Sequence, residues 1–98
     1  MIYVRLIDDI KLTYNTFDEI VNYCKHQIIE LNCAYNKLTL LPDSIGYLIN
    51  LKYLDCSNNK LTLLPNSIGY LINLKVLYCS NNKLSLLPDS IGYLEYTN

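Results

Sequence analysis

The sequence has few of the features that most functional classes require. Tryptophan is absent, and glycine and proline occur only three times each. Eight basic residues stand against nine acidic ones, so the net charge of −1 lacks the basic excess typical of nucleic-acid-binding proteins. No apolar run approaches the roughly 18 to 20 residues that span a bilayer, so we expect no membrane segment.

Targeting signals and disulfide patterns are missing too. Residues 1–5 lack the basic segment and the long apolar segment of a signal peptide. We therefore expect an intracellular, cytoplasmic protein whose four cysteines stay reduced. Ninety-eight residues suffice for one small domain.

Sets of catalytic or metal-binding residues cannot be assembled. His26 is the only histidine, and no nucleophile–base pair or glycine-rich phosphate loop is present. Cys33, Cys56 and Cys79 recur every 23 residues, but a zinc site needs about four ligands, often as close C-x₂₋₄-C pairs. Small buried core positions explain these cysteines better. We expect no enzyme activity, no cofactor and no metal.

What the sequence does contain is a 23-residue repeat. Residues 51–73 (LKYLDCSNNKLTLLPNSIGYLIN) and 74–96 (LKVLYCSNNKLSLLPDSIGYLEY) agree at 17 of 23 positions without gaps. Residues 28–50 follow the same frame with more differences. A fixed period of this length is typical of a solenoid, in which neighbouring units stack to build a continuous core.

Each repeat predicts one short strand and one convex turn. Counting positions 1 to 23 from residues 28, 51 and 74, the leucine at position 4 and the cysteine at position 6 point to one side of a strand. A proline at position 15 ends the extended segment, and the S-I-G-x-L that follows is long enough for one helical or 3₁₀ turn. The prediction is an α/β solenoid with short parallel strands on the concave side and helical or 3₁₀ turns on the convex side.

This pattern resembles the leucine-rich-repeat signature L-x-x-L-x-L-x-x-N-x-L, with cysteine in the third apolar position. The trailing L-P-x-S-I-G-x-L resembles the 23-residue class of that family, and the resemblance covers residues 28–94. The form LDCSNNKLTLLP is also similar to repeats of giant amoeba viruses and some bacterial effectors; a viral origin would place the protein in the host cytoplasm. The resemblance implies a non-catalytic role in protein–protein interaction.

The chain divides into an N-terminal cap at 1–27 and three leucine-rich repeats at 28–50, 51–73 and 74–96, within one structural domain. In the cap, Ile7, Ile10, Leu12 and Asn15 fit a degenerate first repeat, and Thr16 with Glu19 resembles a helix capping box. An alternative is a β-hairpin that pairs residues 2–6 with 10–14. The pattern favours the degenerate repeat.

The solvent-facing positions of the strands supply a candidate protein-binding surface, because the two best-matched repeats differ non-conservatively there. The predicted binding residues are Glu30, Asn32, Tyr53, Asp55, Asn58, Val76, Tyr78, Asn81, Lys60 and Lys83. The two lysines favour a partner with some acidic character. On the convex side, a column of tyrosines (Tyr47, Tyr70 and Tyr93) is expected to pack partly against neighbouring turns.

Asparagine at position 9 forms a predicted structural column of Asn36, Asn59 and Asn82, whose amides satisfy backbone groups in the turns. The expected partner is a protein, with no nucleic acid and no membrane. The alternative is a structural or self-assembling repeat protein, or a repeat fragment without a dedicated partner. The last repeat lacks a cap in this reading, which would leave an unpaired strand edge and Leu77, Leu84, Leu87 and Ile91 partly uncovered. We therefore expect a homodimer through the C-terminal end.

Overall fold

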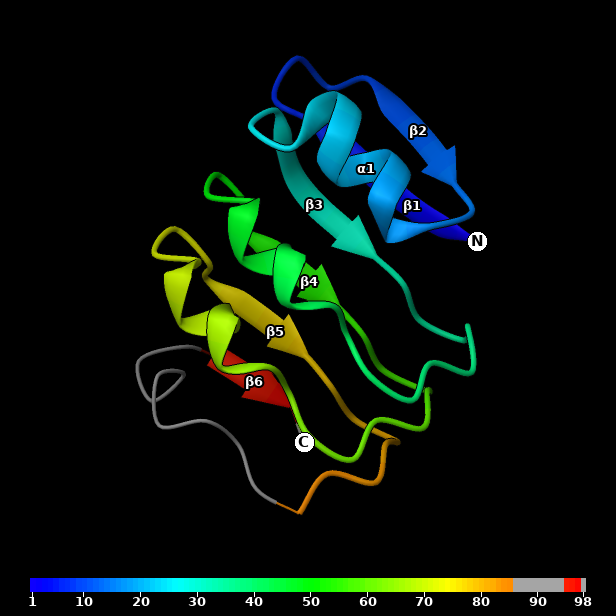
Figure 1. Ribbon diagram of the computed structural model, residues 1–98. Helices are drawn as coiled ribbons and strands as arrows, with labels where there is room; N and C mark the ends of the chain where they lie inside the picture. The colour runs from blue at the N-terminus through cyan, green and yellow to red at the C-terminus, as the bar shows by residue number, and fades with distance from the viewer. Residues whose placement is uncertain (86–94, 98) are drawn as a thin grey trace.

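The computed structural model describes residues 1–85 and 95–97 (Figure 1). Within these residues, six strands form one sheet in the order β2-β1-β3-β4-β5-β6. The elements in chain order are β1 Ile2–Leu6, β2 Lys11–Tyr14, α1 Phe17–Cys24, β3 Ile28–Asn32, η1 Asp43–Tyr47, β4 Tyr53–Asp55, η2 Asn66–Tyr70, β5 Val76–Tyr78 and β6 Glu95–Thr97.

The repeated strands pair in parallel and in register. Leu31 of β3 lies beside Leu54 of β4, which lies beside Leu77 of β5, and all three side chains are fully buried. β6 extends the same parallel arrangement beyond β5. The 23-residue period therefore becomes one step across the sheet, as the sequence predicts, and residues of one position form a row.

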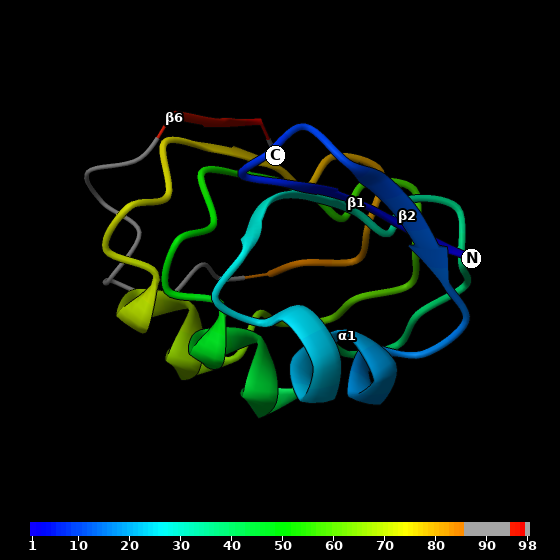
Figure 2. The same ribbon diagram turned by 90° about the horizontal axis from the view of Figure 1, so that it is seen from above.

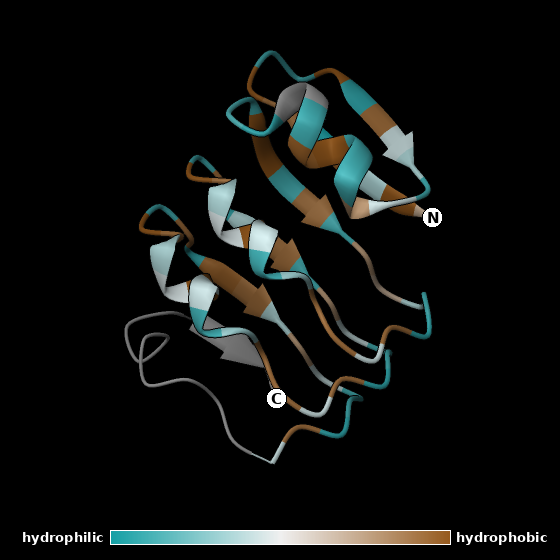
Figure 3. Cartoon of the chain, viewed as in Figure 1, coloured by the Kyte–Doolittle hydropathy of each residue, from teal (hydrophilic) through white to brown (hydrophobic). Residues whose placement is uncertain are grey.

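The helical elements lie together on one face of the sheet. Figure 2 shows α1, η1 and η2 side by side below the strands. η1 and η2 are 3₁₀ helices that begin directly after Pro42 and Pro65, and they bury Ile45 and Ile68. Figure 3 shows hydrophobic and hydrophilic segments alternating along β2 and β3, as a sheet with one buried face requires. The predicted convex turn of repeat 74–96 lies outside the described residues.

The N-terminal cap is a hairpin, so the prediction of a degenerate first repeat is wrong for residues 7–15. β1 is antiparallel to β2 on one side and to β3 on the other, with Val4 between Leu12 and Leu31. Ile7 and Ile10, which fit the repeat template, are 63% and 50% exposed. They lie in the hairpin turn, where the Leu6 amide donates to the Ile10 carbonyl oxygen at 2.8 Å.

Burial explains why the hairpin forms. Ile2, Val4 and Leu6 alternate along β1 and are buried on the helix side, so β1 closes the end of the core beside β3. The turn uses a left-handed residue, Asp9 at φ 68°. A short polar side chain such as aspartate tolerates this backbone better than most residues do.

Helix α1 begins as the sequence predicts. The Thr16 hydroxyl accepts from the Glu19 amide at 3.4 Å, and the Glu19 carboxylate accepts from the Thr16 amide at 3.2 Å, which completes a capping box. Ile20 is fully buried, and Phe17 and Val21 pack against the core from its margin. The helix therefore fills the place that 3₁₀ turns fill in the later coils.

The C-terminal edge also differs from the expectation. β6 pairs with β5 in parallel, so the β5 edge that we expected to be unpaired has a neighbour. Leu77 is fully buried rather than partly uncovered, and Leu84 is half-buried. Leu87 and Ile91 lie outside the described residues. The stated basis for a dimer through an open β5 edge is thus removed.

Candidate protein-binding face

The sheet face turned away from the helices is here called the concave face. Odd-numbered residues of β1 and their partners on the next strands form two rows across it, because side chains alternate along a strand. One row runs Tyr3, Asn32, Asp55, Tyr78, and the other runs Arg5, Glu30, Tyr53, Val76. Six of the predicted binding residues therefore share this face with two residues of β1.

A shallow groove lies on the concave face. Its volume is about 260 Å³. Pockets for small molecules and cofactors usually measure about 300–1,000 Å³ and enclose most of the ligand, so this groove is better suited to one protruding side chain. The residues lining it are Tyr3, Glu30, Leu31, Asn32, Tyr53, Leu54, Asp55 and Tyr78.

The carboxylate of Asp55 is held in place by Ser57, which follows β4. Its Oδ1 accepts from the Ser57 amide at 3.0 Å and from the Ser57 hydroxyl at 2.6 Å. The Asn58 amide group in turn donates to the Ser57 hydroxyl at 3.3 Å. In the preceding coil Asn32 makes the equivalent contact with the Ala34 amide at 2.9 Å. These side chains are therefore oriented before any partner arrives.

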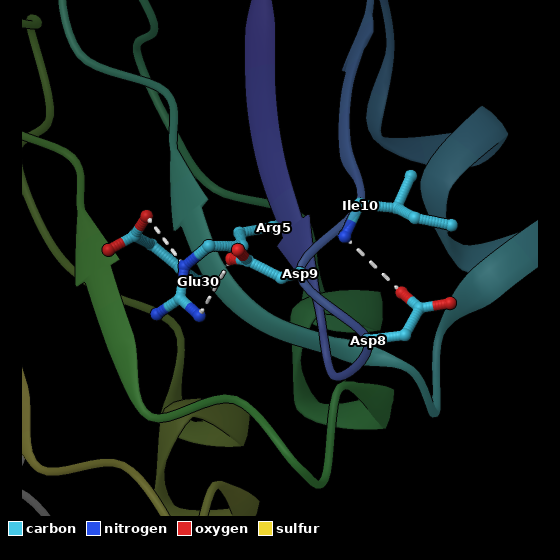
Figure 4. Close-up of polar contacts among 5 residues, drawn as sticks. All are labelled: Arg5, Asp8, Asp9, Ile10 and Glu30. Carbon is cyan, nitrogen blue, oxygen red and sulfur yellow. Dashed lines mark hydrogen bonds and ion pairs between the residues drawn. The ribbon is translucent and has the colours of Figure 1, made fainter.

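The second carboxylate of the groove is already paired. The Arg5 guanidinium lies 3.5 Å from the Glu30 carboxylate and 3.8 Å from the Asp9 carboxylate (Figure 4). Asp55 forms no ion pair within residues 1–85 and 95–97. Asp55 is therefore the uncompensated charge among the groove residues.

Five predicted binding residues do not line the groove: Val76, which shares the concave face, and Asn58, Asn81, Lys60 and Lys83, which follow the strands. Asn58 and Asn81 follow the strands in a left-handed backbone, each at φ 56°, and Tyr35 occupies the same position at φ 59°. Asparagine adopts this region more readily than most residues, which explains its recurrence at position 8. Lys60 and Lys83 are exposed beyond that turn, outside the groove lining. The acidic partner expected from these lysines thus has no support from the groove.

The asparagine column occupies the turns, where it joins neighbouring coils. Asn59 is buried, and its Oδ1 accepts from the Asn36 and Leu38 amides at 2.9 and 3.0 Å. Its Nδ2 donates to the carbonyl oxygens of Cys33 and Cys56 at 3.1 and 3.0 Å. Asn82 repeats this pattern one coil later with the Cys56 and Cys79 carbonyls.

The column ends at the N-terminal cap. Asn36 has no earlier repeat to bind, and its side chain instead contacts Met1: Nδ2 donates to the Met1 carbonyl oxygen at 3.0 Å, and Oδ1 accepts from the terminal ammonium. The hairpin therefore supplies the contacts that a preceding coil would supply.

A second asparagine pair was missed in the sequence. Asn50 and Asn73, at position 23, each donate to a carbonyl oxygen of the preceding coil, that of His26 at 2.7 Å and that of Ile49 at 2.9 Å. The signal was available, because both residues occupy the same position of the repeat. These bonds tie the convex ends of the coils as the first column ties the other turn.

The repeated cysteines lie in the core. Cys33, Cys56 and Cys79 are buried thiols stacked from coil to coil. Burial, assisted by the nearby Asp55 carboxylate, raises the pKa of Cys33 to about 12. The pKa values of Cys56 and Cys79 are also raised, chiefly by burial. A protonated, buried thiol is a poor nucleophile and a poor metal ligand.

The convex tyrosines are covered only in part. Tyr47 and Tyr70 are 59% and 70% exposed, and each ring contacts the element before its own. Tyr47 lies under the Lys25 ammonium, 5.6 Å from the ring centroid. The Tyr70 ring lies beside Gly46 of the neighbouring turn, with its Cδ2 atom 3.1 Å from the place of a Cβ on that glycine. Tyr93 lies outside the described residues.

Tyr3 and Arg5 are the functional candidates that sequence reasoning did not name. Their alternation with Ile2, Val4 and Leu6 places them on the solvent face of a strand. That β1 pairs directly with β3, and so brings Tyr3 into the groove, does not follow from this alternation.

Across the described part of the chain, no cluster of three or more histidine, cysteine or acidic residues is arranged to hold a metal ion. None of the helices described there has the length and apolar character needed to cross a bilayer.

Comparison with known proteins points to one repeat family. A model described as leucine-rich repeats in two copies matches residues 49–93, and a leucine-rich-repeat model matches residues 27–48. The solved structure of a leucine-rich-repeat protein of Leptospira interrogans is similar, with 44% identity over 68% of this chain and a TM-score of 0.64. The matched part is 18% of that protein's chain. Among curated proteins, no sequence matches.

Proposed function

Since this chain belongs to the leucine-rich-repeat family, whose members generally mediate protein–protein interaction, we propose that it binds a protein partner without catalysis through the concave face. The observation that carries the proposal is the groove, which Tyr3, Tyr53 and Tyr78 line together with Glu30, Asn32 and Asp55. Binding energy at protein interfaces concentrates in a few aromatic and arginine side chains near the centre.

The groove tyrosines are available for a partner. Tyr53 and Tyr78 are 37% and 45% exposed and lie on adjacent strands, in neighbouring rows of the concave face. Neither belongs to the hydrophobic core cluster. A partner that covers them gains buried aromatic surface without disturbing the packing that holds the coils together.

The test is a double substitution on this face. Tyr53→Ala with Tyr78→Ala is expected to weaken partner binding by roughly 30-fold or more, the effect of losing one or two interface hot spots. The unfolding midpoint should change little, because both side chains face solvent. Affinity capture followed by mass spectrometry identifies the partner, and titration calorimetry measures the loss.

Tyr47→Ala with Tyr70→Ala is the matched control. These two tyrosines are at least as exposed but lie on the convex side. The control should bind the partner as the parent protein does. Normal binding by the concave variant together with lost binding by the convex variant would contradict the proposal.

Self-assembly is a second candidate, favoured by exposed aliphatic side chains. Leu40 and Leu63, at position 13, are 63% and 60% exposed, and Ile72 is 85% exposed. Exposed apolar residues on neighbouring coils favour association. Sedimentation velocity over a range of concentrations separates the two functions: a monomer at high concentration argues against assembly, and a concentration-dependent oligomer that binds no other protein argues for it.

A further inference from the structure

We propose that the groove of the concave face receives an arginine side chain of the partner, with the Asp55 carboxylate as its counter-ion and the tyrosines as its walls. This inference rests on the proposed function and specifies what the binding face recognises. It reverses the charge preference expected from Lys60 and Lys83, which lie outside the groove lining.

The first step of the argument is the position of Asp55. In its row across the sheet it lies between Asn32 of β3 and Tyr78 of β5, about 4.8 Å from each strand axis. Tyr53 is two residues before it on β4 and points to the same face, about 6.7 Å along the strand. The Asp55 carboxylate is therefore flanked by one aromatic ring from its own strand, β4, and one from the neighbouring strand, β5.

The second step is charge. A partner that covers the groove removes water from Asp55, and a buried carboxylate without a counter-charge is strongly unfavourable. Arg5 cannot compensate it, because its guanidinium is engaged with Glu30 at 3.5 Å and Asp9 at 3.8 Å. The occupant must therefore bring a positive charge; an acidic or purely apolar side chain would leave Asp55 uncompensated.

The third step is shape. A guanidinium is planar, stacks on aromatic rings and donates hydrogen bonds to carboxylate oxygens; because Ser57 already donates twice to Oδ1 of Asp55, Oδ2 is the oxygen that it meets. The groove offers both a carboxylate and aromatic rings, and its volume of about 260 Å³ suits one side chain. Ser57 holds Oδ1 of Asp55 through its amide and hydroxyl, so the carboxylate is fixed in orientation. Among the repeats, position 5 is Asn32, Asp55 and Tyr78, so only the middle coil supplies the charge.

The test uses two peptides on the full chain. Acetyl-Gly-Ala-Arg-Ala-Gly-amide and the same peptide with citrulline, the neutral isostere of arginine, are titrated while NMR follows the Ser57 amide and the tyrosine rings. We expect the arginine peptide to shift these signals and to bind roughly tenfold more tightly than the citrulline peptide. Equal affinity of the two peptides would overturn the inference without any variant being needed.

A variant locates the contact. Asp55→Asn keeps an Oδ1 acceptor for Ser57 but removes the charge, and it should reduce affinity for the arginine peptide by up to roughly fivefold. Asp43→Asn is the control: Asp43 is exposed on η1, and the next coil carries Asn66 at that position. Unchanged binding by Asp55→Asn, or an equal loss in Asp43→Asn, would overturn the inference.

A displayed random-peptide library separates this inference from the proposed function. Selected peptides that lose binding to the Tyr53→Ala, Tyr78→Ala protein but contain no arginine would leave the concave face as the binding surface and overturn the arginine assignment. Selected peptides that bind this variant normally would contradict the proposed function itself. Arginine-containing peptides that lose binding to both Asp55→Asn and the tyrosine variant support both.

Discussion

Where each coil leaves the sheet, one asparagine carboxamide makes the hydrogen bonds between coils that backbone groups make within the sheet. Asn59 accepts two amide protons of the preceding coil and donates to carbonyl oxygens of both coils. Asn59 is buried, so water cannot replace these hydrogen bonds. The stability of two adjacent turns therefore depends on a single side chain.

Asn59→Ala should lower the free energy of unfolding by roughly 1–3 kcal/mol, because it leaves buried backbone groups without partners. Urea denaturation measures the loss. Asn58→Gly is the matched control: glycine accepts the left-handed backbone at φ 56° and gives up only the 3.3 Å contact with Ser57. That change should stay within about 0.5 kcal/mol. Equal losses in the two variants would show that the Asn59 amide is not structurally special.

The same turn shows what a single-residue pattern can hide. Position 8 is asparagine in two of the coils and looks like an ordinary surface position. Its backbone is nevertheless left-handed in all three coils, including the first, where the residue is Tyr35. Tyrosine seldom adopts this conformation, so nothing in its side chain announces it. The backbone of Tyr35 follows from the hydrogen-bonded neighbour coil rather than from local preference.

At the scale of the elements, η1 and η2 can approach each other closely because Gly46 has no side chain. A Cβ added to Gly46 would lie 2.9 Å from the Ser67 carbonyl oxygen and 3.0 Å from the Ser67 Cβ. The Tyr70 ring atom Cδ2 would be 3.1 Å away. Backbone cannot move aside as the end of a flexible side chain can, so glycine at position 19 sets the distance between the convex turns.

Gly46→Ala should therefore destabilise the protein by roughly 1–3 kcal/mol through overpacking, although alanine favours helical backbone. Thermal denaturation followed by circular dichroism measures the change. Ser44→Ala, in the same 3₁₀ helix, removes no hydrogen bond that the structure shows between described residues and should change stability by about 0.5 kcal/mol or less. A Gly46→Ala protein as stable as the parent would mean that the turns can separate freely.

The period of the repeat is sufficient to predict the parallel strands and their register, because Leu31, Leu54 and Leu77 recur at one position and must share one buried row. The cap shows the limit of that reasoning. Ile2, Val4 and Leu6 fit a strand of either direction, and Ile7, Ile10 and Leu12 fit the repeat template although two of them end in an exposed turn. Direction depends on which neighbour completes the core, and Tyr3 reaches the groove only because β1 is antiparallel to β3.

At the scale of the whole molecule, the core contains a line of protonated thiols. The pKa of Cys33 rises from 9.0 to about 12, and those of Cys56 and Cys79 rise as well. Above pH 9 the unfolded chain releases these protons while the folded chain keeps them. The stabilising contribution is therefore complete below about pH 9 and is lost as the pH rises towards the folded-state pKa.

The free energy of unfolding, measured by urea denaturation, should consequently be independent of these thiols up to about pH 8. Above pH 9 it should fall by as much as about 1.4 kcal/mol per pH unit for each thiol. Cys33→Ala with Cys56→Ala should start from a lower stability but show a shallower decline. An identical slope in the two proteins would contradict the assignment of the alkaline loss to these thiols.

The place of the groove beside the cap has an evolutionary consequence. Its lining comes from β1, β3, β4 and β5, so the proposed recognition unit consists of the hairpin and the first three coils. Each coil of a solenoid interacts with its immediate neighbours, and gene duplication or unequal recombination of a 23-residue unit beyond β5 changes the length of the stack without changing that unit. If the proposed function holds, relatives of different length inherit one specificity, whereas an exchange within residues 3–78 creates a new one.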